Sequence, residues 1–429
     1  MNSIQRTKAP EFRTIDHVEV LQARRDELDN GIPFFSISAG SQEISKIEFL
    51  FRAGMYYQPS VLIASCTNAL LESGTRSYDA NAFSEGLDFY GSYLELEVDQ
   101  DYASVTLYSL NKYLPESLHY IEELLKYPQF PAEEFRIHLS NKKQKHIINS
   151  QKVSVLARRK FAELLYGPSH PYGVMVQDSD FDKLELSELK NFFAQRYGYR
   201  DCCIVASGKL SPDLKNVLNT KFGTDKWGEG TRLASVSHTF EKPQARKTFV
   251  ARKEAIQSAI RIGRLLFNKT HPDYFKFQVL NTILGGYFGS RLMANIREDK
   301  GYTYGIGSGL SNYVHAGAFF ISTEVGTDVT EKALQEIYRE IKRLREDLVD
   351  AQEVETVRNY MLGNFLRSVD GPFALADKFK AIWEFGLDYT YYDRYFKAVK
   401  EVNPAELREL ANKYLQVDQL LECVVGKTD

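Results

Sequence analysis

The sequence predicts an α+β protein made of two tandem homologous domains, each a mainly antiparallel sheet with helices packed on one face. First, 429 residues exceed one ordinary hydrophobic core and suggest two domains of about 200 residues each. Second, the end of the first half recurs at the end of the chain: Tyr197 and Gly208 match Tyr414 and Gly426, at offsets of 414 − 197 = 217 and 426 − 208 = 218 residues. Third, short strands come in pairs separated by tight turns, which is typical of antiparallel sheets.

The elements of the first half follow from apolar periodicity. Short apolar, partly alternating segments predict strands at residues 34–38, 47–53, 93–98, 103–110 and 202–207. Longer amphipathic segments predict helices at residues 60–73, 80–87, 115–125, 133–165 and 185–197. Gly74 is expected to end the first of these helices, and the long helix at 133–165 is expected to be interrupted near Ser150.

The second half follows the same plan. Residues 103–110, followed by a helix from Pro115, resemble residues 318–324, followed by a helix from Thr330. Residues 223–247 are rich in Gly, Ser, Thr and charge and predict a linker. The expected domains are therefore residues 1–222 and 248–429.

Residues 281–310, NTILGGYFGSRLMANIREDKGYTYGIGSGL, contain the most unusual pattern in the chain. Ser290 is a candidate helix N-cap, and Gly301 is a suitable stop because glycine tolerates the left-handed conformation. Residues 302–310 alternate between larger side chains and glycine, which predicts a strand. This arrangement directs Arg297, near the helix end, and Tyr304, on the next strand, toward neighbouring space.

A strand face made of glycine lets a ligand or another backbone approach closely. Gly305, Gly307 and Gly309 form such a face and are the candidate substrate-binding residues. A structural interpretation is also open, because the helix dipole alone favours an arginine at a helix C-terminus. A tyrosine that alternates with isoleucine, as Tyr304 does, is commonly a core residue.

Composition and charge narrow the class of protein. The net charge of −3 argues against a nucleic-acid binder, which usually carries a basic excess. The N-terminal residues lack the apolar segment of a signal peptide, and no segment approaches the length of a membrane span. Cys66, Cys202, Cys203 and Cys423 are expected to be reduced and buried rather than a disulfide framework. A cytoplasmic location is expected.

Three segments resemble the insulinase or pitrilysin-like (M16) family of zinc metallopeptidases, in particular its shorter two-domain members such as mitochondrial processing peptidase subunits and bacterial relatives. They are HPYG at 170–173 with the following CCIVASGK, GGYFGSRLMANIREDKGYTYGI, and the closing ECVVGK. Members that contain the second segment use an Arg and a Tyr seven residues apart to hold the substrate backbone near zinc. Arg297 and Tyr304 match this pair, since 304 − 297 = 7.

Catalytic members of the family carry an inverted zinc motif, H-x-x-E-H, on the helix before the first Gly-Thr. Alignment on Gly74-Thr75 places Ser65 and Ala69 at the histidine positions and Asn68 at the glutamate position. The region of the third ligand, normally a glutamate, offers Gln144 or Lys145 instead. All four functional groups of the zinc site are thus absent.

No alternative zinc site is evident, because no two of the eight histidines lie three or four residues apart. His315, close to the glycine-rich strand, is the histidine kept as a candidate. The sequence therefore predicts no metal or other cofactor in this chain.

The resemblance implies a zinc-less, Arg/Tyr-bearing subunit of a heteromeric peptidase that cleaves extended peptides. Its partner would be an M16 subunit with H-x-x-E-H and would contain the zinc; the isolated chain could also form a homodimer. Two alternatives of the same fold stay open: a non-catalytic structural or core subunit, and a protein that binds peptides without cleaving them. A self-sufficient zinc protease is the least favoured interpretation, because Ala69 has no donor atom.

Overall fold

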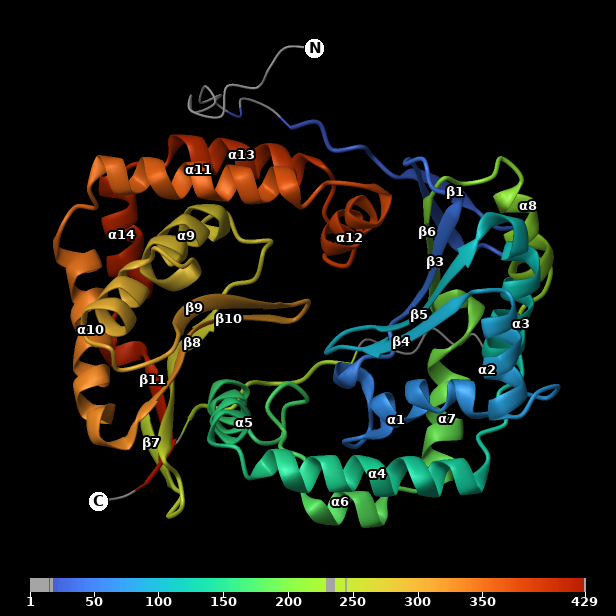
Figure 1. The fold of residues 1–429 in the computed structure, drawn as a ribbon, viewed down its shortest axis with the longest axis horizontal. Helices are drawn as coiled ribbons and strands as arrows, with labels where there is room; N and C mark the ends of the chain where they lie inside the picture. Colours follow the sequence, from blue (N-terminus) through green and yellow to red (C-terminus); the bar gives the residue numbers. More distant parts are fainter. Residues whose placement is uncertain (1–14, 16–17, 229–235, 244, 428–429) are drawn as a thin grey trace, which may run out of the picture.

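The computed structural model describes residues 15, 18–228, 236–243 and 245–427. It contains two mixed β-sheets with surrounding helices, one sheet from each half of the chain (Figure 1). The predicted α+β class is confirmed. The predicted linker at 223–247 includes residues 229–235 and 244, which lie outside the described residues.

The strands are β1 (Arg24–Glu27), β2 (Pro33–Ser38), β3 (Ile44–Phe51), β4 (Tyr93–Val98), β5 (Ala103–Leu110), β6 (Cys202–Gly208), β7 (Lys247–Ala251), β8 (Gln257–Leu266), β9 (Ile306–Tyr313), β10 (Ala316–Gly326) and β11 (Leu421–Gly426). The first sheet has the order β1-β2-β6-β3-β5-β4, and the second has the order β7-β11-β8-β10-β9. In each sheet one pair is parallel, β2 with β6 and β7 with β11, and the other pairs are antiparallel. Apart from β1, the two sheets therefore share one strand order and one pattern of pairing directions.

The α-helices are α1 (Ile63–Ala69), α2 (Ala80–Phe89), α3 (Leu114–Lys126), α4 (Ala132–Ser150), α5 (Val153–Tyr166), α6 (Asp178–Lys183), α7 (Leu186–Arg196), α8 (Leu214–Leu218), α9 (Tyr274–Asn281), α10 (Thr330–Glu346), α11 (Ala351–Arg367), α12 (Pro372–Trp383), α13 (Thr390–Glu401) and α14 (Pro404–Tyr414). Three π-helical segments are η5 (Asn219–Gly223), η6 (Thr282–Gly286) and η7 (Met293–Asp299). Among the described residues, no helix combines the length and the apolar character needed to cross a bilayer.

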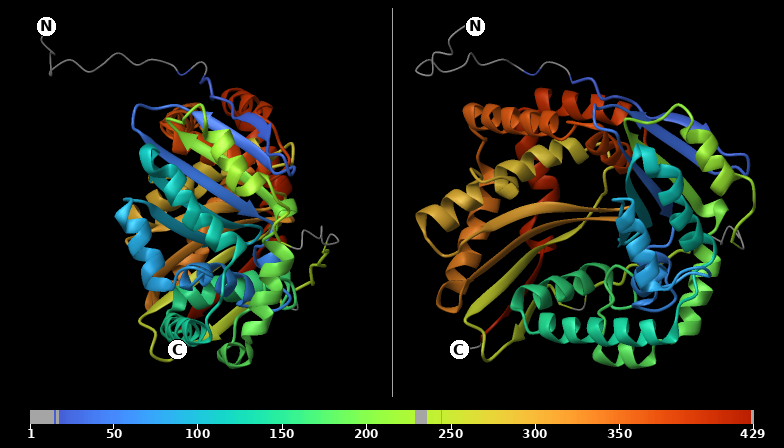
Figure 2. Two further views of the ribbon diagram at one scale, coloured as in Figure 1. Left: turned by 90° about the vertical axis from the view of Figure 1, so that its right-hand side faces the viewer. Right: turned by 45° about the vertical axis from the view of Figure 1, so that its right-hand side comes forward.

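Each half contributes one helix to the sheet of the other half. Helices α1, α2, α3, α7 and α8 cover one face of the first sheet, and α12 from the second half packs on its other face through Leu375, Ala376 and Phe379. Helices α9, α10, α11, α13 and α14 cover one face of the second sheet, and α5 from the first half packs on its other face. Figures 1 and 2 show this exchange, which buries apolar surface from both halves together.

Buried charges accompany the packing of α12 on the first sheet. Glu48 Oε1 on β3 lies 3.1 Å from Lys46 Nζ and also accepts a hydrogen bond from Lys380 Nζ on α12. The Glu48 side chain is only 2% exposed. Burial by itself would lower the pKa of Lys380, but the interaction with Glu48 outweighs it, so the pKa is raised. This ion-pair cluster joins the two halves.

A second junction lies where the β9–β10 hairpin meets the β4–β5 turn. The Val314 backbone N–H donates to Asp101 Oδ2 at 2.8 Å, and the Tyr172 hydroxyl donates to the other carboxylate oxygen. The His315 ring stacks on Tyr56 with 3.8 Å between ring centroids. His315 is therefore a contact of this junction, and the hypothesis of a metal-binding role for it gains no support.

His170 belongs to the same junction and makes stability dependent on pH. Its Nδ1 accepts the Tyr172 N–H at 3.1 Å, and its ring stacks on Phe240. Burial, and then the neighbouring His238 and His315, lower the pKa of His170 to about 4. Because the pKa in the unfolded chain is about 6.5, the stabilisation is complete above pH 6.5 and is lost as the pH falls from there toward 4.

We expect His170→Asn to retain an acceptor for the Tyr172 N–H but to remove this titration. Urea unfolding of wild type and variant at a series of pH values between 7 and 4 measures the effect. The variant should lose less free energy of unfolding on acidification than wild type does. Parallel loss in both proteins would contradict this explanation.

The structure corrects two predicted elements. The helix expected at 60–73 is shorter, because Leu62 has a left-handed backbone (φ 76°) and α1 starts only at Ile63. The strand expected at 302–310 starts only at Ile306. The predicted break near Ser150 is confirmed, since α4 ends at Ser150 and α5 starts at Val153. All four cysteines are buried free thiols, as expected.

Candidate functional site

The site is built on the end of η7 and the loop that follows it. Gly301 has φ 66°, and its N–H donates to Arg297 O at 3.2 Å, while the Tyr302 N–H donates to Ile296 O at 3.0 Å. These bonds satisfy carbonyls at the helix end and turn the chain toward β9, as the glycine predicted. The helix begins directly after Ser290, but the Ser290 hydroxyl has no hydrogen-bond partner. The predicted N-cap role of Ser290 is therefore wrong.

Side-chain hydrogen bonds hold residues 301–305 as a loop. The Thr303 hydroxyl donates to the Glu324 carbonyl at 2.7 Å and accepts the Gly305 N–H at 3.1 Å. The Thr323 hydroxyl donates to the Gly305 carbonyl at 3.0 Å. Thr303 is thus fixed against β10, and the adjacent Tyr304 side chain extends into solvent with 92% of its surface exposed.

Arg297 and Tyr304 lie side by side. The guanidinium carbon of Arg297 is 5.4 Å from the centroid of the Tyr304 ring and 4.6 Å from that of the Phe288 ring. Both distances are within the range of cation–π attraction, which orients the guanidinium between two exposed aromatic rings. Arg297 has no carboxylate partner among the described residues. Its donors and the Tyr304 hydroxyl are therefore free to bind a ligand or a partner.

The three glycines of the predicted binding face differ in their surroundings. A Cβ atom at Gly305 would meet open space, whereas one at Gly309 would come within 2.8 Å of the Phe320 ring. A Cβ at Gly307 would lie 3.3 Å from the Gly285 carbonyl oxygen. Close packing inside the chain thus explains why residue 309 is a glycine and leaves little room for a side chain at residue 307. Gly305 is the position where a peptide backbone could approach.

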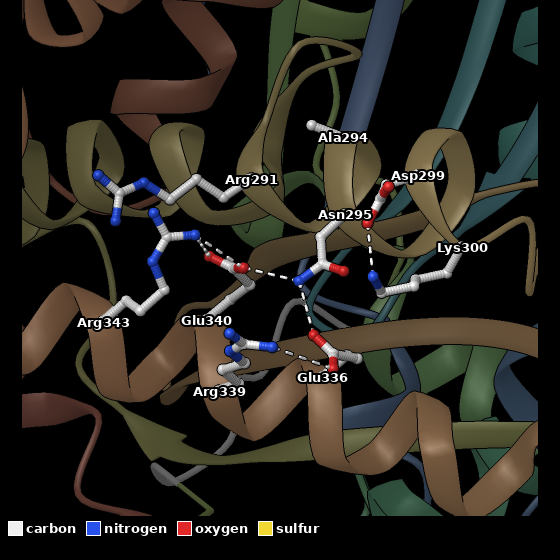
Figure 3. A pocket seen from close by; sticks show the side chains of 9 residues that line it. All are labelled: Arg291, Ala294, Asn295, Asp299, Lys300, Glu336, Arg339, Glu340 and Arg343. Carbon is white, nitrogen blue, oxygen red and sulfur yellow. Dashed lines mark hydrogen bonds and ion pairs between the residues drawn. The ribbon is translucent and has the colours of Figure 1, made fainter.

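Polar contacts fix the other side of η7 to α10. Figure 3 shows a pocket between these helices in which the Asn295 side-chain amide donates to Glu336 at 2.9 Å and to Glu340 at 2.7 Å. Arg343 and Glu340 form an ion pair at 3.1 Å. Arg297 does not line this pocket. The contacts anchor the helix that carries Arg297, so that its position is set by the core.

The positions that correspond to the zinc motif serve structural roles. The Asn68 amide nitrogen donates to the carbonyls of Glu97 at 3.0 Å and Ser104 at 3.3 Å, and its carbonyl oxygen accepts the Tyr197 hydroxyl at 3.1 Å. Asn68 is 1% exposed. All of these polar atoms are occupied in joining α1 to β4, β5 and α7, which leaves none for a water or a metal.

The other positions do not fit zinc either. The Ser65 hydroxyl donates to the Leu62 carbonyl at 3.2 Å, Ala69 has no donor atom, and Gln144 on α4 is exposed. Structural zinc-ligand sets consist of Cys, His, Asp or Glu side chains, and no group of three such residues able to hold a metal occurs within the described part of the chain.

Comparison with known proteins shows which family the chain is similar to. Residues 183–361, which include Arg297 and Tyr304, match the family described as "Peptidase M16 inactive domain". The "Non-peptidase homolog YmxG" of Helicobacter pylori is 22% identical over 368 residues, covering 83% of this chain and 82% of that protein. The chain is therefore similar, over most of its length, to a relative of the M16 peptidase type, and its residues 183–361 match the M16 inactive-domain family.

A second relative and two solved structures are also similar to this chain. The "Uncharacterized zinc protease YmxG" of Bacillus subtilis is 22% identical over 69% of this chain and 72% of its own length. The crystal structure of a peptidase M16 inactive domain from Pseudomonas fluorescens has a TM-score of 0.85 and 22% identity, covering 95% of this chain and 99% of that chain. A protease structure from Helicobacter pylori has a TM-score of 0.86 at 15% identity. Residues 183–361 thus match an M16 inactive domain, the fold is that of the compared structures, and a protein named a non-peptidase homologue is among the relatives.

Sequence reasoning missed two residues of the site. Phe288, 62% exposed, stacks on Arg297; no local pattern distinguishes it from Tyr287, which lies between the same glycines and packs against the core. Arg261 on β8 lines a pocket with Tyr304. No local pattern marks Arg261, since its proximity to Tyr304 arises from strand pairing across the second sheet.

Proposed function

We propose that this chain is the zinc-less, Arg/Tyr-bearing subunit of a heteromeric M16-type peptidase that cleaves extended peptides. The observation that carries the proposal is the contrast between the two halves. The half-buried Arg297 lies beside the exposed Tyr304 and makes no ion pair among the described residues, whereas Ser65, Asn68 and Ala69 cannot form a zinc site. A partner subunit with H-x-x-E-H would supply the metal and the activated water.

The chemistry of this chain's own residues follows from their donors. The Tyr304 hydroxyl can donate a hydrogen bond to the oxyanion that develops when water attacks a peptide carbonyl. The Arg297 guanidinium can donate to a carbonyl of the peptide, and the open Gly305 backbone lets the peptide approach. Because such contacts involve the peptide backbone, we expect loose sequence preference.

Further features fit this proposal. The matching strand orders of the two sheets support an origin by tandem duplication, and four free thiols support a reducing compartment such as the cytoplasm. Two alternatives use the same fold: a structural core subunit, and a peptide-binding protein without peptidase activity. The free donors of Arg297 and Tyr304 favour the peptidase subunit over the structural one.

Reconstitution tests the proposal. The purified chain is mixed with the H-x-x-E-H-bearing M16 protein of the same organism, and cleavage of a quenched fluorescent peptide library is measured for each protein alone and for the mixture. We expect cleavage by the mixture and none by this chain alone. Peptide binding without cleavage, in the presence of every such partner, would favour the peptide-binding alternative instead.

A further inference from the structure

A pocket of about 340 Å³ lies directly beside Tyr304 and Gly305. Its walls include Ser154 from α5, Arg261 from β8, and Ser322 and Glu324 from β10. Arg261 and Ser322 are directly opposite each other in the sheet. The pocket therefore connects the Arg297–Tyr304 site to the face of the second sheet that α5 covers.

Arg261 is a half-buried cation without a carboxylate partner among the described residues. Its guanidinium carbon lies 5.7 Å from the Phe320 ring centroid. Burial, and then the nearby Arg158, lower the pKa of the Arg261 guanidinium, and the attraction of Glu324 only partly opposes them. Partial desolvation of an unpaired charge is unfavourable, and an anion in the pocket would offset that cost.

The pocket between η7 and α10 provides a contrast within the same domain. There every basic side chain has an acidic partner. Figure 3 shows Arg339 paired with Glu336 at 3.5 Å, Arg343 with Glu340 at 3.1 Å and Lys300 with Asp299 at 2.6 Å. Arg291 pairs with Glu353 at 2.7 Å. The positive charges of that pocket are therefore neutralised by its own acidic partners. The pocket beside Tyr304 leaves its cation available.

Glu324 also lines the pocket; its carboxylate attracts Arg261 electrostatically but forms no ion pair with it. Glu324 opposes the charge of Arg261, and the exposed Arg158 just outside the pocket adds a second positive charge that also attracts an anion. The hydroxyls of Ser154 and Ser322, which have no hydrogen-bond partner in the described part of the chain, add donors on the same walls.

We propose that this pocket binds an acidic side chain of the peptide that Arg297 and Tyr304 hold, with Arg261 as the specificity-determining residue. The proposal rests on the proposed function and adds a substrate class to it: peptides with a glutamate or aspartate at one defined position. A guanidinium can bind a carboxylate through two parallel hydrogen bonds, which distinguishes an acid from an amide of the same shape.

Peptide-binding measurements on the full chain test this assignment. The probes are labelled nine-residue Gly/Ser/Ala peptides with one glutamate placed at each position in turn, and a matched series with glutamine; binding is followed by fluorescence anisotropy. We expect one position at which glutamate binds about tenfold more tightly than glutamine, the size of one charge-assisted hydrogen bond.

Variants of the pocket identify the responsible group. Arg261→Gln should abolish the preference, Arg261→Lys should keep part of it, and Arg261→Glu should shift it toward lysine-containing peptides. Glu324→Gln should increase the preference for glutamate. Thermal unfolding of each variant verifies that the fold is retained.

The possible failures are distinguishable. Equal binding of glutamate and glutamine peptides at every position, or a preference that survives Arg261→Gln, would overturn the assignment of the pocket while leaving the proposed function intact. Absence of binding for every peptide would contradict the proposed function, and the assignment with it.

Discussion

Tyr304→Phe should lower peptide turnover by the reconstituted peptidase about a hundredfold, the effect of removing one oxyanion donor. The variant lacks only the hydroxyl, so the ring still contacts Arg297 and peptide affinity should change much less than turnover. Because Tyr304 is 92% exposed, the free energy of unfolding should be unchanged. Steady-state kinetics of the assembled complex, together with peptide binding and urea unfolding, measure the three quantities.

Tyr360→Phe is the matched control. Tyr360 on α11 is 40% exposed, and its hydroxyl has no hydrogen-bond partner among the described residues. The same loss of a hydroxyl there should leave turnover at the wild-type level. Equal turnover for Tyr304→Phe and wild type would exclude Tyr304 as an oxyanion donor.

Glu48→Ala should destabilise the protein by about 3 to 5 kcal/mol, the usual cost of removing one partner from a buried ion pair. The change removes the buried partner of Lys46 and Lys380 and leaves both lysines with Asp377, whose side chain is 61% exposed. The loss should appear in urea unfolding as a lower midpoint, and it should be accompanied by weaker packing of α12 on the first sheet.

Glu43→Ala provides the comparison. Glu43 pairs with Lys209 at the end of the same sheet, but the two side chains are 64% and 51% exposed. Exposed ion pairs contribute under about 1 kcal/mol, so this variant should unfold close to the wild-type midpoint. Similar midpoints for the two variants would show that the Glu48 cluster contributes no more than a surface pair.

Much of the fold could be predicted because local patterns and tertiary structure agree. The strands at 93–98 and 103–110 were predicted with the bounds that β4 and β5 have, since alternation and a polar turn specify both. The start of the helix predicted at 60–73 could not be placed from the sequence. Leu62 has a left-handed backbone, which is unfavourable for leucine and is imposed by its surroundings.

The parts of the candidate site that depend on a local backbone conformation could be predicted from the sequence. The parts that depend on tertiary contacts could not. Gly301 predicted the end of the helix and so the proximity of Arg297 and Tyr304. The strand predicted at 302–310 was too long, because hydrogen bonds from Thr303 and Thr323 to a distant strand hold residues before Ile306 as a loop. Helices α5 and α12 each pack on the sheet of the other half, through contacts between residues far apart in the sequence. Apolar periodicity is a local pattern and does not predict such contacts.

The central claim is that this chain contributes arginine and tyrosine but no zinc to a shared active site. The most direct test is elemental analysis of zinc in the purified chain and in its reconstituted complex, after mild dialysis. We predict almost no zinc in the chain alone and about one zinc per heterodimer. About one zinc per isolated chain would contradict the claim, because ligands other than Ser65, Asn68, Ala69 and Gln144 would then hold the metal and the chain could act alone.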